Sequence, residues 1–404
     1  MRRMLLATLV FACALVLAGA LALTQRPRES QRARSAAEID AILEGLRLPE
    51  DFSISLYARA PGARTLAVGP SGKVIFIGTG ADNTVYVLAP GGGHGVRVER
   101  LELAFEFDLP HGLCFSPEGT LFIVERNRVL SIPNAEEEWR RPHARIVVAK
   151  GDLIPRQEES DGHTLRVCRV GPDGKLYISL GQPYDVAPKE KLAFYERTGV
   201  GGIIRMNPDG SKRDVFARGV RNSVGMDFNP ADGSLWFTDN QTNELGDDKP
   251  PGELNRAPIP WLHFGFPWYG GGHVRTAEYA SDEPPPGVIF PEVEEEAHAA
   301  DLGMVFYTGD TFPKKYRGGI FSAQHGSGAR TQPVGARLMF TRPGPDGTGG
   351  VSEPFVEGWN KGSMPYLGTP VDVAQTPHGD LLVTDDENGA IYRISYGRSI
   401  IAGE

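Results

Sequence analysis

One short pattern recurs along the chain and limits its fold more than any other feature: a turn with Pro and Gly, an apolar run, and a polar or acidic end. Five clear copies read VGPSGKVIFIGT, FSPEGTLFIVER, VGPDGKLYISLG, FNPADGSLWFTDN and QTPHGDLLVTDD. Their prolines are Pro70, Pro117, Pro172, Pro230 and Pro377, at spacings of 47, 55, 58 and 147 residues. The longest gap contains a degenerate copy, FPKKYRGGIFSAQHG, centred near Gly318, which makes six copies.

The chemistry of each copy predicts a β-hairpin. Pro presets its own φ and Gly tolerates positive φ, so the turn reverses the chain. The run that follows is β-branched and aromatic, as strands are. One hairpin cannot bury both of its faces, whereas radial stacking of copies covers them, and a period of about 40–60 residues is typical of propellers. We therefore predict an all-β, six-bladed β-propeller over residues 47–398; a β-sandwich with accidental turn similarity is the alternative.

The N-terminus reads as an export signal. Two arginines precede Leu5–Leu23, a stretch of 19 residues without charge, and a basic segment followed by an apolar one is the pattern of a secretory signal. The apolar stretch is also nearly long enough to cross a bilayer. Residues 1–23 are thus predicted to be a cleaved signal peptide or an N-terminal membrane anchor, and both place the rest of the chain in the periplasm or outside the cell.

Two further segments depart from the repeat. Residues 24–46 are interpreted as a polar spacer with a short helix around Ala36 to Leu46. Residues 243–300 carry acidic, Pro- and Gly-rich stretches and are predicted to form long loops, which in propellers commonly build a site. The acidic run Glu292 to Glu296 is interpreted as solvated surface, with metal binding as the alternative.

Charge and cysteine content limit the partners. The net charge is −9, and a chain this acidic does not have the excess of basic residues that nucleic-acid-binding proteins have. Outside the N-terminal apolar stretch the cysteines are Cys114 and Cys168, both in apolar, strand-like runs. We interpret them as buried thiols, and a disulfide between them is the alternative.

Several cationic or polar residues occupy a similar phase of the repeat, close to an expected inner strand. They are Arg64, His111, His163, Arg221 and His325. Inner strands converge on a propeller's axis, so imidazoles and guanidiniums at this phase predict an anion site with a possible base. No nucleophile elbow, P-loop, dinucleotide fingerprint or HExxH motif occurs. Redox chemistry at such a site would need a bound cofactor.

A family resemblance adds to this reading. Its carriers include LPHGLCFSPEGTLFIVERNRVL, DGHTLRVCRVGPDGKLYISLGQP, GGIIRMNPDGSKRDVFARGVRNSVGMDFNPADGSLWFTDN and LGMVFYTGDTFPKKYRGGIFSAQHGS. From residue 47 to 397 the chain resembles the glucose/sorbosone dehydrogenase family, and its sorbosone-dehydrogenase-like branch most. The resemblance implies an exported six-bladed propeller that uses pyrroloquinoline quinone (PQQ) and Ca²⁺. It also implies a sugar or sugar-derived aldehyde or alcohol as substrate, and a cytochrome or quinone outside the cytoplasm as electron acceptor.

The same resemblance implies residue roles. His163 matches the base that takes the substrate's hydroxyl proton while hydride passes to the quinone. Arg221 matches the arginine that stabilises charge developing there. Cofactor contacts would come from Arg64, Asn222, His325 and Arg330. The segment after the fourth copy falls where the family ligates calcium through backbone carbonyls, which points to Gln241 and Thr242.

Departures from the branch keep other functions open. The branch's His-Gly-Ser-Trp-Asn-Arg reads HGSGAR from His325 to Arg330, and its Gly-Arg-Pro reads Gly368-Thr369-Pro370. An aromatic, an amide and an arginine are therefore missing from the expected cofactor rim. One alternative function is a non-catalytic propeller that binds a sugar or a partner and has lost its cofactor. A calcium-dependent hydrolase of the lactonase kind is the other, although its chemistry favours converging carboxylates over His and Arg.

Overall fold

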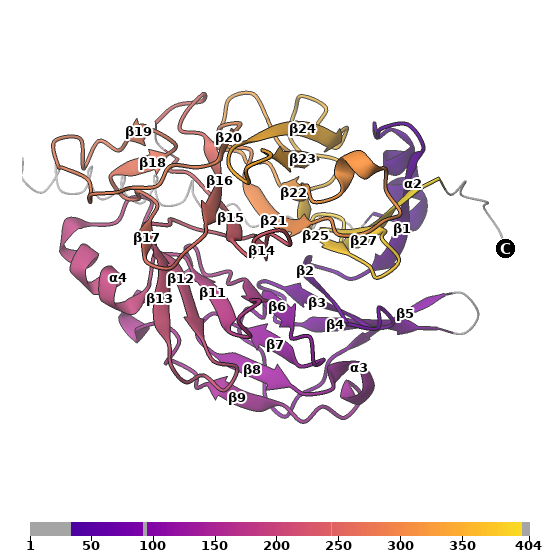
Figure 1. Cartoon of the computed structure of the whole chain (residues 1–404). Coiled ribbons are helices and arrows are strands. Elements are labelled where there is room, and N and C mark those ends of the chain that lie inside the picture. Colours follow the sequence, from indigo (N-terminus) through magenta and orange to yellow (C-terminus); the bar gives the residue numbers. More distant parts are fainter. Residues whose placement is uncertain (1–33, 92–94, 244, 398–404) are drawn as a thin grey trace, which may run out of the picture. The chain divides into compact units, whose positions relative to one another are not determined.

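Six mainly antiparallel sheets are arranged around a central axis in the computed structural model, which describes residues 34–91, 95–243 and 245–397 (Figure 1). The compact unit begins at Ala36. The predicted all-β, six-bladed propeller is confirmed. The innermost strands β2, β6, β10, β14, β21 and β25 each contact the next, and β25 contacts β2, so that the ring is closed.

The first three blades follow one another along the chain. Blade one contains β2 (Ala63–Val68), β3 (Ile75–Thr79), β4 (Val85–Pro90) and β5 (Val96–Arg100). Blade two contains β6 (Gly112–Phe115), β7 (Leu121–Val124), β8 (Val129–Ile132) and β9 (Arg145–Val148). Blade three contains β10 (Cys168–Val170), β11 (Leu176–Leu180), β12 (Gly202–Met206), β13 (Asp214–Arg218) and a short fifth strand, β17 (Leu262–His263).

The other three blades complete the ring. Blade four contains β14 (Met226–Phe228), β15 (Leu235–Asp239), β16 (Gly252–Ala257) and β20 (Val293–Glu295). Blade five contains β21 (Asp301–Phe306), β22 (Ile320–Gln324), β23 (Arg337–Pro343) and β24 (Gly350–Val356). Blade six contains β25 (Pro370–Gln375), β26 (Leu381–Asp385), β27 (Ala390–Tyr396) and β1 (Phe52–Arg59). Blade six is thus built from both ends of the propeller, with Phe52 opposite Tyr396.

All six repeat turns join an innermost strand to the second strand of its blade. Each turn places one glycine in the left-handed region, with φ between 71° and 84°: Gly72, Gly119, Gly174, Gly233, Gly318 and Gly379. A side chain is strained in that region, which is why the repeat requires glycine at this position.

The few helices lie outside the sheets. Among the described residues they are α2 (Ala36–Glu44), α3 (Ala135–Glu138) and α4 (Leu192–Thr198), with 3₁₀ turns η1 (Arg156–Glu158), η2 (Lys189–Lys191) and η3 (Lys314–Tyr316). The expected helix near residue 36 is present as α2. Its Ile39 and Leu43 are buried in the same apolar cluster as Phe321 and Tyr392, so this part of the predicted spacer packs on the propeller.

The stretch predicted as long loops, residues 243–300, has more regular structure than expected. It contains β16, β17, the two-stranded sheet of β18 (Tyr269–Gly271) and β19 (Val274–Arg275), and β20. The acidic run in it is only partly solvated, because Glu295 on β20 is buried whereas Glu294 is exposed. β20 is the outer strand of blade four, and its alternation of faces explains the difference.

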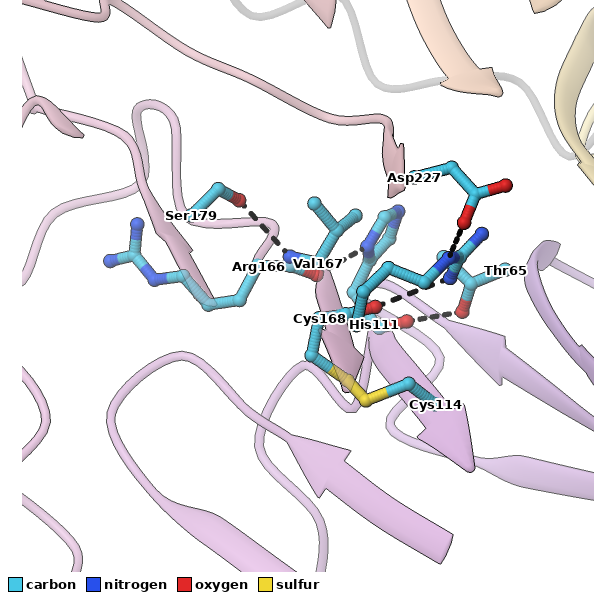
Figure 2. Close-up of a disulfide and its surroundings, with 9 residues drawn as sticks. Thr65, His111, Cys114, Arg166, Val167, Cys168, Ser179 and Asp227 are labelled. Carbon is cyan, nitrogen blue, oxygen red and sulfur yellow. Dashed lines mark hydrogen bonds and ion pairs between the residues drawn. A yellow bond between two sulfur atoms is a disulfide. The ribbon is translucent and has the colours of Figure 1, made fainter. Parts of the chain in front are cut away.

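Cys114 and Cys168 form a disulfide, with their Cα atoms 5.7 Å apart (Figure 2). The interpretation of both as free thiols is therefore wrong. The two residues lie on β6 and β10, the neighbouring innermost strands of blades two and three, and this adjacency could not be read from a sequence separation of 54.

Within the described ranges no helix is long and apolar enough to span a bilayer. The predicted signal peptide or anchor, residues 1–23, lies outside the described residues.

Candidate functional site

A cavity of about 290 Å³ lies at one end of the ring, near the starts of the innermost strands β2, β10, β14 and β21. This volume is close to the lower end of small-molecule sites, at about 300 Å³. Five of the eight predicted site residues line it: Arg64, His163, Arg221, Asn222 and Gln241. Arg64 comes from β2, His163 precedes β10, Arg221 and Asn222 precede β14, and Gln241 follows β15. Residues far apart in the sequence thus meet because the repeat returns each inner strand to the axis.

His163 is held tightly at the wall of this cavity. Its main chain adopts φ 50°, in the left-handed region that non-glycine residues rarely occupy. Its Nδ1 lies 2.6 Å from the carbonyl oxygen of Gln182. A carbonyl only accepts, so Nδ1 donates, and the neutral ring carries its lone pair on Nε2.

Burial, and then the positive charge of Arg221, lower the pKa of His163 to about 4. The imidazole is therefore neutral near pH 7 and can accept a proton on Nε2. Strained backbone at a residue with a displaced pKa is typical of functional sites.

The Arg221 side chain is almost fully engaged within the protein. Its Nε donates to the carbonyl oxygen of Asp185 at 2.9 Å, its Nη2 to the Asp185 carboxylate at 2.5 Å, and its Nη1 to the carbonyl of Asn240 at 3.0 Å. Sequence reasoning did not identify Asp185, which lies in an irregular segment that carries no motif. Arg221 thus meets the cavity as a partner of Asp185 and not as a free cation.

The main-chain N–H groups of Arg221 and Asn222 both donate to one buried carboxylate. Asp239, at the end of β15, accepts from the backbone N–H of Arg221 at 2.7 Å and of Asn222 at 2.6 Å. Asp239 is the acidic end of the fourth repeat copy, so a signal for this role was present in the sequence. Burial raises its pKa to about 6, despite these hydrogen bonds.

Arg64 and His325 share one carboxylate, that of Asp386. Arg64 Nη1 pairs with Asp386 Oδ2, and His325 Nε2 lies 3.0 Å from Asp386 Oδ1. The hydroxyl of Thr369, where the branch has arginine, also donates to Asp386 at 2.7 Å. Burial alone would raise the pKa of Asp386, yet Arg64 and His325 hold it well below its usual range. His325 does not line the cavity and instead supports the residue that pairs with Arg64.

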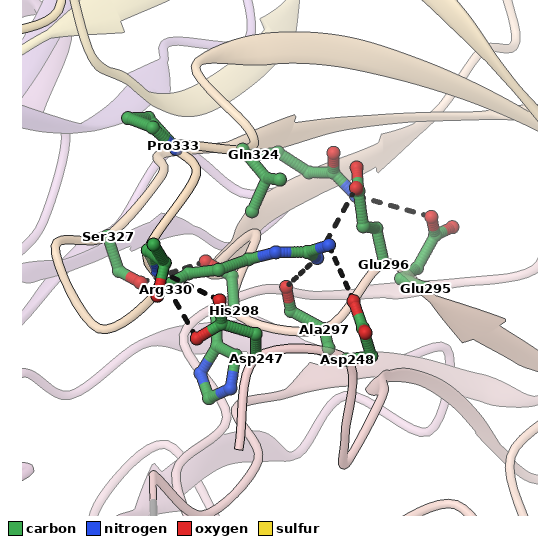
Figure 3. A network of polar contacts seen from close by, with 12 residues as sticks. Asp247, Asp248, Glu295, Glu296, Ala297, His298, Gln324, Ser327, Arg330 and Pro333 are labelled. Atoms are coloured by element: carbon green, nitrogen blue, oxygen red, sulfur yellow. Dashed lines mark hydrogen bonds and ion pairs between the residues drawn. The ribbon is translucent and has the colours of Figure 1, made fainter. Parts of the chain in front are cut away.

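Arg330 also lies outside the cavity lining. Its Nη2 pairs with Asp248 at 2.8 Å and its Nη1 contacts the carboxylate of Glu296 and the carbonyl of Ala297 (Figure 3). Arg330 therefore fastens the HGSGAR loop to the segment around residue 248. Ser327 of the same loop does line the cavity.

The donors and acceptors left without protein partners fit an anionic quinone beside a hard cation. Within the described part of the chain, the buried atoms lacking a hydrogen-bond partner include Arg64 Nε, Asn222 Oδ1, Gln241 Oε1 and Thr242 Oγ1. A guanidinium N–H suits a carboxylate, and amide and hydroxyl oxygens suit Ca²⁺. Thr242 is buried behind the lining, and its N–H donates to Gly270. No group of three or more His, Cys, Asp or Glu side chains able to hold a metal is found among the described residues.

The family model described as Glucose / Sorbosone dehydrogenase matches residues 147–327. The predicted resemblance to this family is confirmed over these residues, and the predicted branch within the family stays a prediction. The matched stretch contains His163, Arg221, Asn222, Gln241, Thr242 and His325, whereas Arg64 and Arg330 lie outside it. The chain is also 28% identical over 372 residues to an uncharacterized protein from Borreliella burgdorferi, covering 88% of this chain and 92% of that protein.

Solved structures share the propeller fold of this chain. A Trichoderma reesei carbohydrate-active enzyme of family AA12 aligns with a TM-score of 0.71 at 19% identity, over 87% of this chain and 98% of that one. The holo PQQ domain of a Coprinopsis cinerea pyranose dehydrogenase aligns with a TM-score of 0.70 at 14% identity, over 87% and 97%. A PQQ-bound aldose sugar dehydrogenase from Streptomyces coelicolor aligns with a TM-score of 0.59 at 16% identity, over 86% and 99%.

Proposed function

We propose that this protein is a PQQ- and calcium-dependent dehydrogenase that oxidises a sugar, or a sugar-derived aldehyde or alcohol, outside the cytoplasm. The observation that carries the proposal is the neutral imidazole of His163 at the wall of a cavity that it shares with Arg64, Arg221, Asn222 and Gln241. Solved relatives of the same fold include PQQ-bound and calcium-bound structures.

In this proposal each residue has a defined task. The Nε2 lone pair of His163 accepts the proton of the substrate's reacting hydroxyl. Arg221 stabilises negative charge near that point, and Arg64 and Asn222 hold the cofactor's polar edge. Gln241 and Thr242 supply main-chain carbonyl oxygens as ligands to calcium. When bound, PQQ supplies the hydride acceptor that side chains lack.

The proposed location outside the cytoplasm has two supports. The N-terminal sequence has the pattern of an export signal or anchor. The Cys114–Cys168 disulfide suits an oxidising compartment. We therefore propose the periplasm or the cell exterior, with a cytochrome or quinone as the electron acceptor. Residues 1–23 are then either cleaved or retained as a membrane tether.

Reconstitution tests the function directly. Purified protein is titrated with PQQ and Ca²⁺ in a calorimeter and assayed for dye reduction with aldoses and alcohols, beside His163→Ala and the exposed-site control His143→Ala. We expect binding to all three proteins and turnover by all except His163→Ala. Absence of PQQ binding would eliminate the function, whereas turnover that survives in His163→Ala would eliminate the base assignment.

A second candidate function has its own observation. The guanidiniums of Arg64, Arg221 and Arg330 are all paired with carboxylates of the protein, so fewer free cations face an anionic cofactor than the resemblance implies. This favours a non-catalytic propeller that binds a neutral sugar. It predicts sugar binding in the calorimeter without PQQ binding. No observation favours the lactonase-type hydrolase.

A further inference from the structure

A buried arginine that the proposed function does not use, Arg166, donates to the main chain of His163. Arg166 is 1% exposed. Its Nη1 donates to the carbonyl oxygens of His163 at 3.0 Å and Gly181 at 3.2 Å, and its Nε donates to the carbonyl of Arg126 at 3.2 Å. Figure 2 shows its own carbonyl accepting from the ring of His111, at 2.8 Å.

All of these side-chain partners are neutral. Among the described residues no carboxylate forms an ion pair with Arg166. A buried charge without a counter-ion is costly, because carbonyl dipoles replace lost hydration only in part. Burial, and then the charge of Arg126, accordingly lower the pKa of Arg166 to about 10, and the carboxylate of Glu159, which forms no ion pair with it, offsets this only in part. An apolar side chain would avoid this cost, but it would leave the carbonyl oxygens of His163, Gly181 and Arg126 without this donor, so the guanidinium is kept for these three carbonyls.

Two of the carbonyls that accept from Arg166 lie next to the hydrogen bond that orients the His163 ring, one on either side of it in the main chain. One belongs to His163 itself, which is held at φ 50°. Another belongs to Gly181, the residue before Gln182, whose carbonyl accepts the Nδ1 proton of His163. A planar guanidinium can donate to several carbonyls at once in a fixed geometry, which an ammonium cannot do.

We propose that Arg166 is a positioning residue, which fixes the hydrogen bond from His163 to Gln182 and so keeps the Nε2 lone pair of His163 directed to the cavity. This inference rests on the proposed function only for the use made of that lone pair. The orientation itself is a property of the protein without cofactor, and it can be measured there.

The first test uses cofactor-free protein with ¹⁵N-labelled imidazoles. NMR of the wild type should show a single Nδ1–H tautomer for His163, with a titration midpoint near 4. The charged groups around this ring are Arg221, Asp185 and Arg166. In Arg166→Met we expect a mixture of tautomers and a midpoint displaced toward 6.5. In the control Arg205→Met, which removes a guanidinium from the outer part of the same blade, His163 should match wild type.

A charge-conserving variant separates geometry from electrostatics. Arg166→Lys keeps the charge, but its three donors sit on one nitrogen and lack the fixed planar arrangement of the guanidinium, so it should show mixed tautomers with a smaller displacement of the midpoint. A folded Arg166→Met protein with the wild-type tautomer and midpoint would overturn the proposal. If Arg166→Met does not fold, a wild-type tautomer in Arg166→Lys overturns it instead.

Kinetics of the reconstituted protein give a second readout. A displaced base should lower kcat by about 100-fold in Arg166→Met while KM for the sugar stays near that of wild type. An equal loss in Arg205→Met would contradict a positioning role. Should the wild type show no dehydrogenase activity, the proposed function fails, and the tautomer measurement still decides the role of Arg166.

Discussion

Arg221 donates to Asp185 twice, once to its main-chain carbonyl and once to its carboxylate. The side chain of Arg221 is 4% exposed and that of Asp185 is 34% exposed. The ion pair therefore extends from the buried wall toward solvent, and any anionic ligand of Arg221 has to compete with Asp185.

Asp185→Asn should strengthen anion binding. The amide keeps the shape of the side chain but removes its charge, so Arg221 becomes available to a ligand carboxylate. We expect Kd for PQQ, measured by calorimetry, to fall about tenfold, equivalent to ~1.4 kcal/mol. Asp161→Asn is the matched control, because Asp161 lines the same cavity but pairs with Arg126. Equal affinities in wild type and Asp185→Asn would show that Arg221 does not contact the anion.

Gly181→Ala should displace the proposed base. A Cβ atom at this position would lie 2.6 Å from the carbonyl oxygen of His163 and 2.8 Å from Oδ1 of Asn222, so the main chain has to move. We expect a folded protein whose kcat falls about 100-fold in the dye assay. Gly328→Ala serves as control, because no atom lies within 4 Å of a Cβ there, and its activity should match wild type. Wild-type kcat in Gly181→Ala would mean that His163 tolerates displacement.

Removal of the disulfide should lower the stability of the fold. The bridge between Cys114 and Cys168 spans 54 residues, for which the chain-entropy model gives about 4 kcal/mol. We expect the double variant Cys114→Ala/Cys168→Ala to unfold at lower urea concentration and to respond no further to reductant. A wild type whose unfolding midpoint is insensitive to reductant would contradict this prediction.

His111 should make the protein less stable in acid. Burial, and then the charge of Arg64, lower the pKa of His111 to about 3 from 6.5. The unfolded chain thus binds a proton that the folded chain does not, and stability is lost as pH falls below 6.5. Between pH 5.5 and 4.5 the wild type should lose about 1.3 kcal/mol more stability than His111→Gln, in urea unfolding at each pH. Parallel stability profiles would show that His111 is not buried in its neutral form.

The sequence predicted the propeller because its repeat reports local chemistry. A Pro-Gly turn and a β-branched run describe one hairpin each, and hairpins of this kind have few ways to cover their faces. The same phase brought His163, Arg221 and Arg64 to one cavity. What the sequence could not provide is the partner of each charge. Asp185 and Asp386 are brought to their arginines by loops whose path depends on packing, and Cys114 meets Cys168 across a blade boundary.

Arg330 illustrates the same limit. Its position in a family motif predicted a cofactor contact, whereas its side chain is fastened to Asp248 and Glu296. The direction of a long side chain on a surface loop depends on which carboxylate lies nearest, and no periodicity encodes that.

The pairing of β1 with β27 has a consequence for biogenesis. Blade six takes one strand from the start of the propeller and three from its end, so the ring cannot close until Tyr396 has been synthesised and meets Phe52. During synthesis or translocation the growing chain therefore presents an open arc of blades. The cavity shared by Arg64 of the first blade and His163 of the third acquires its final shape only when β1 pairs with β27.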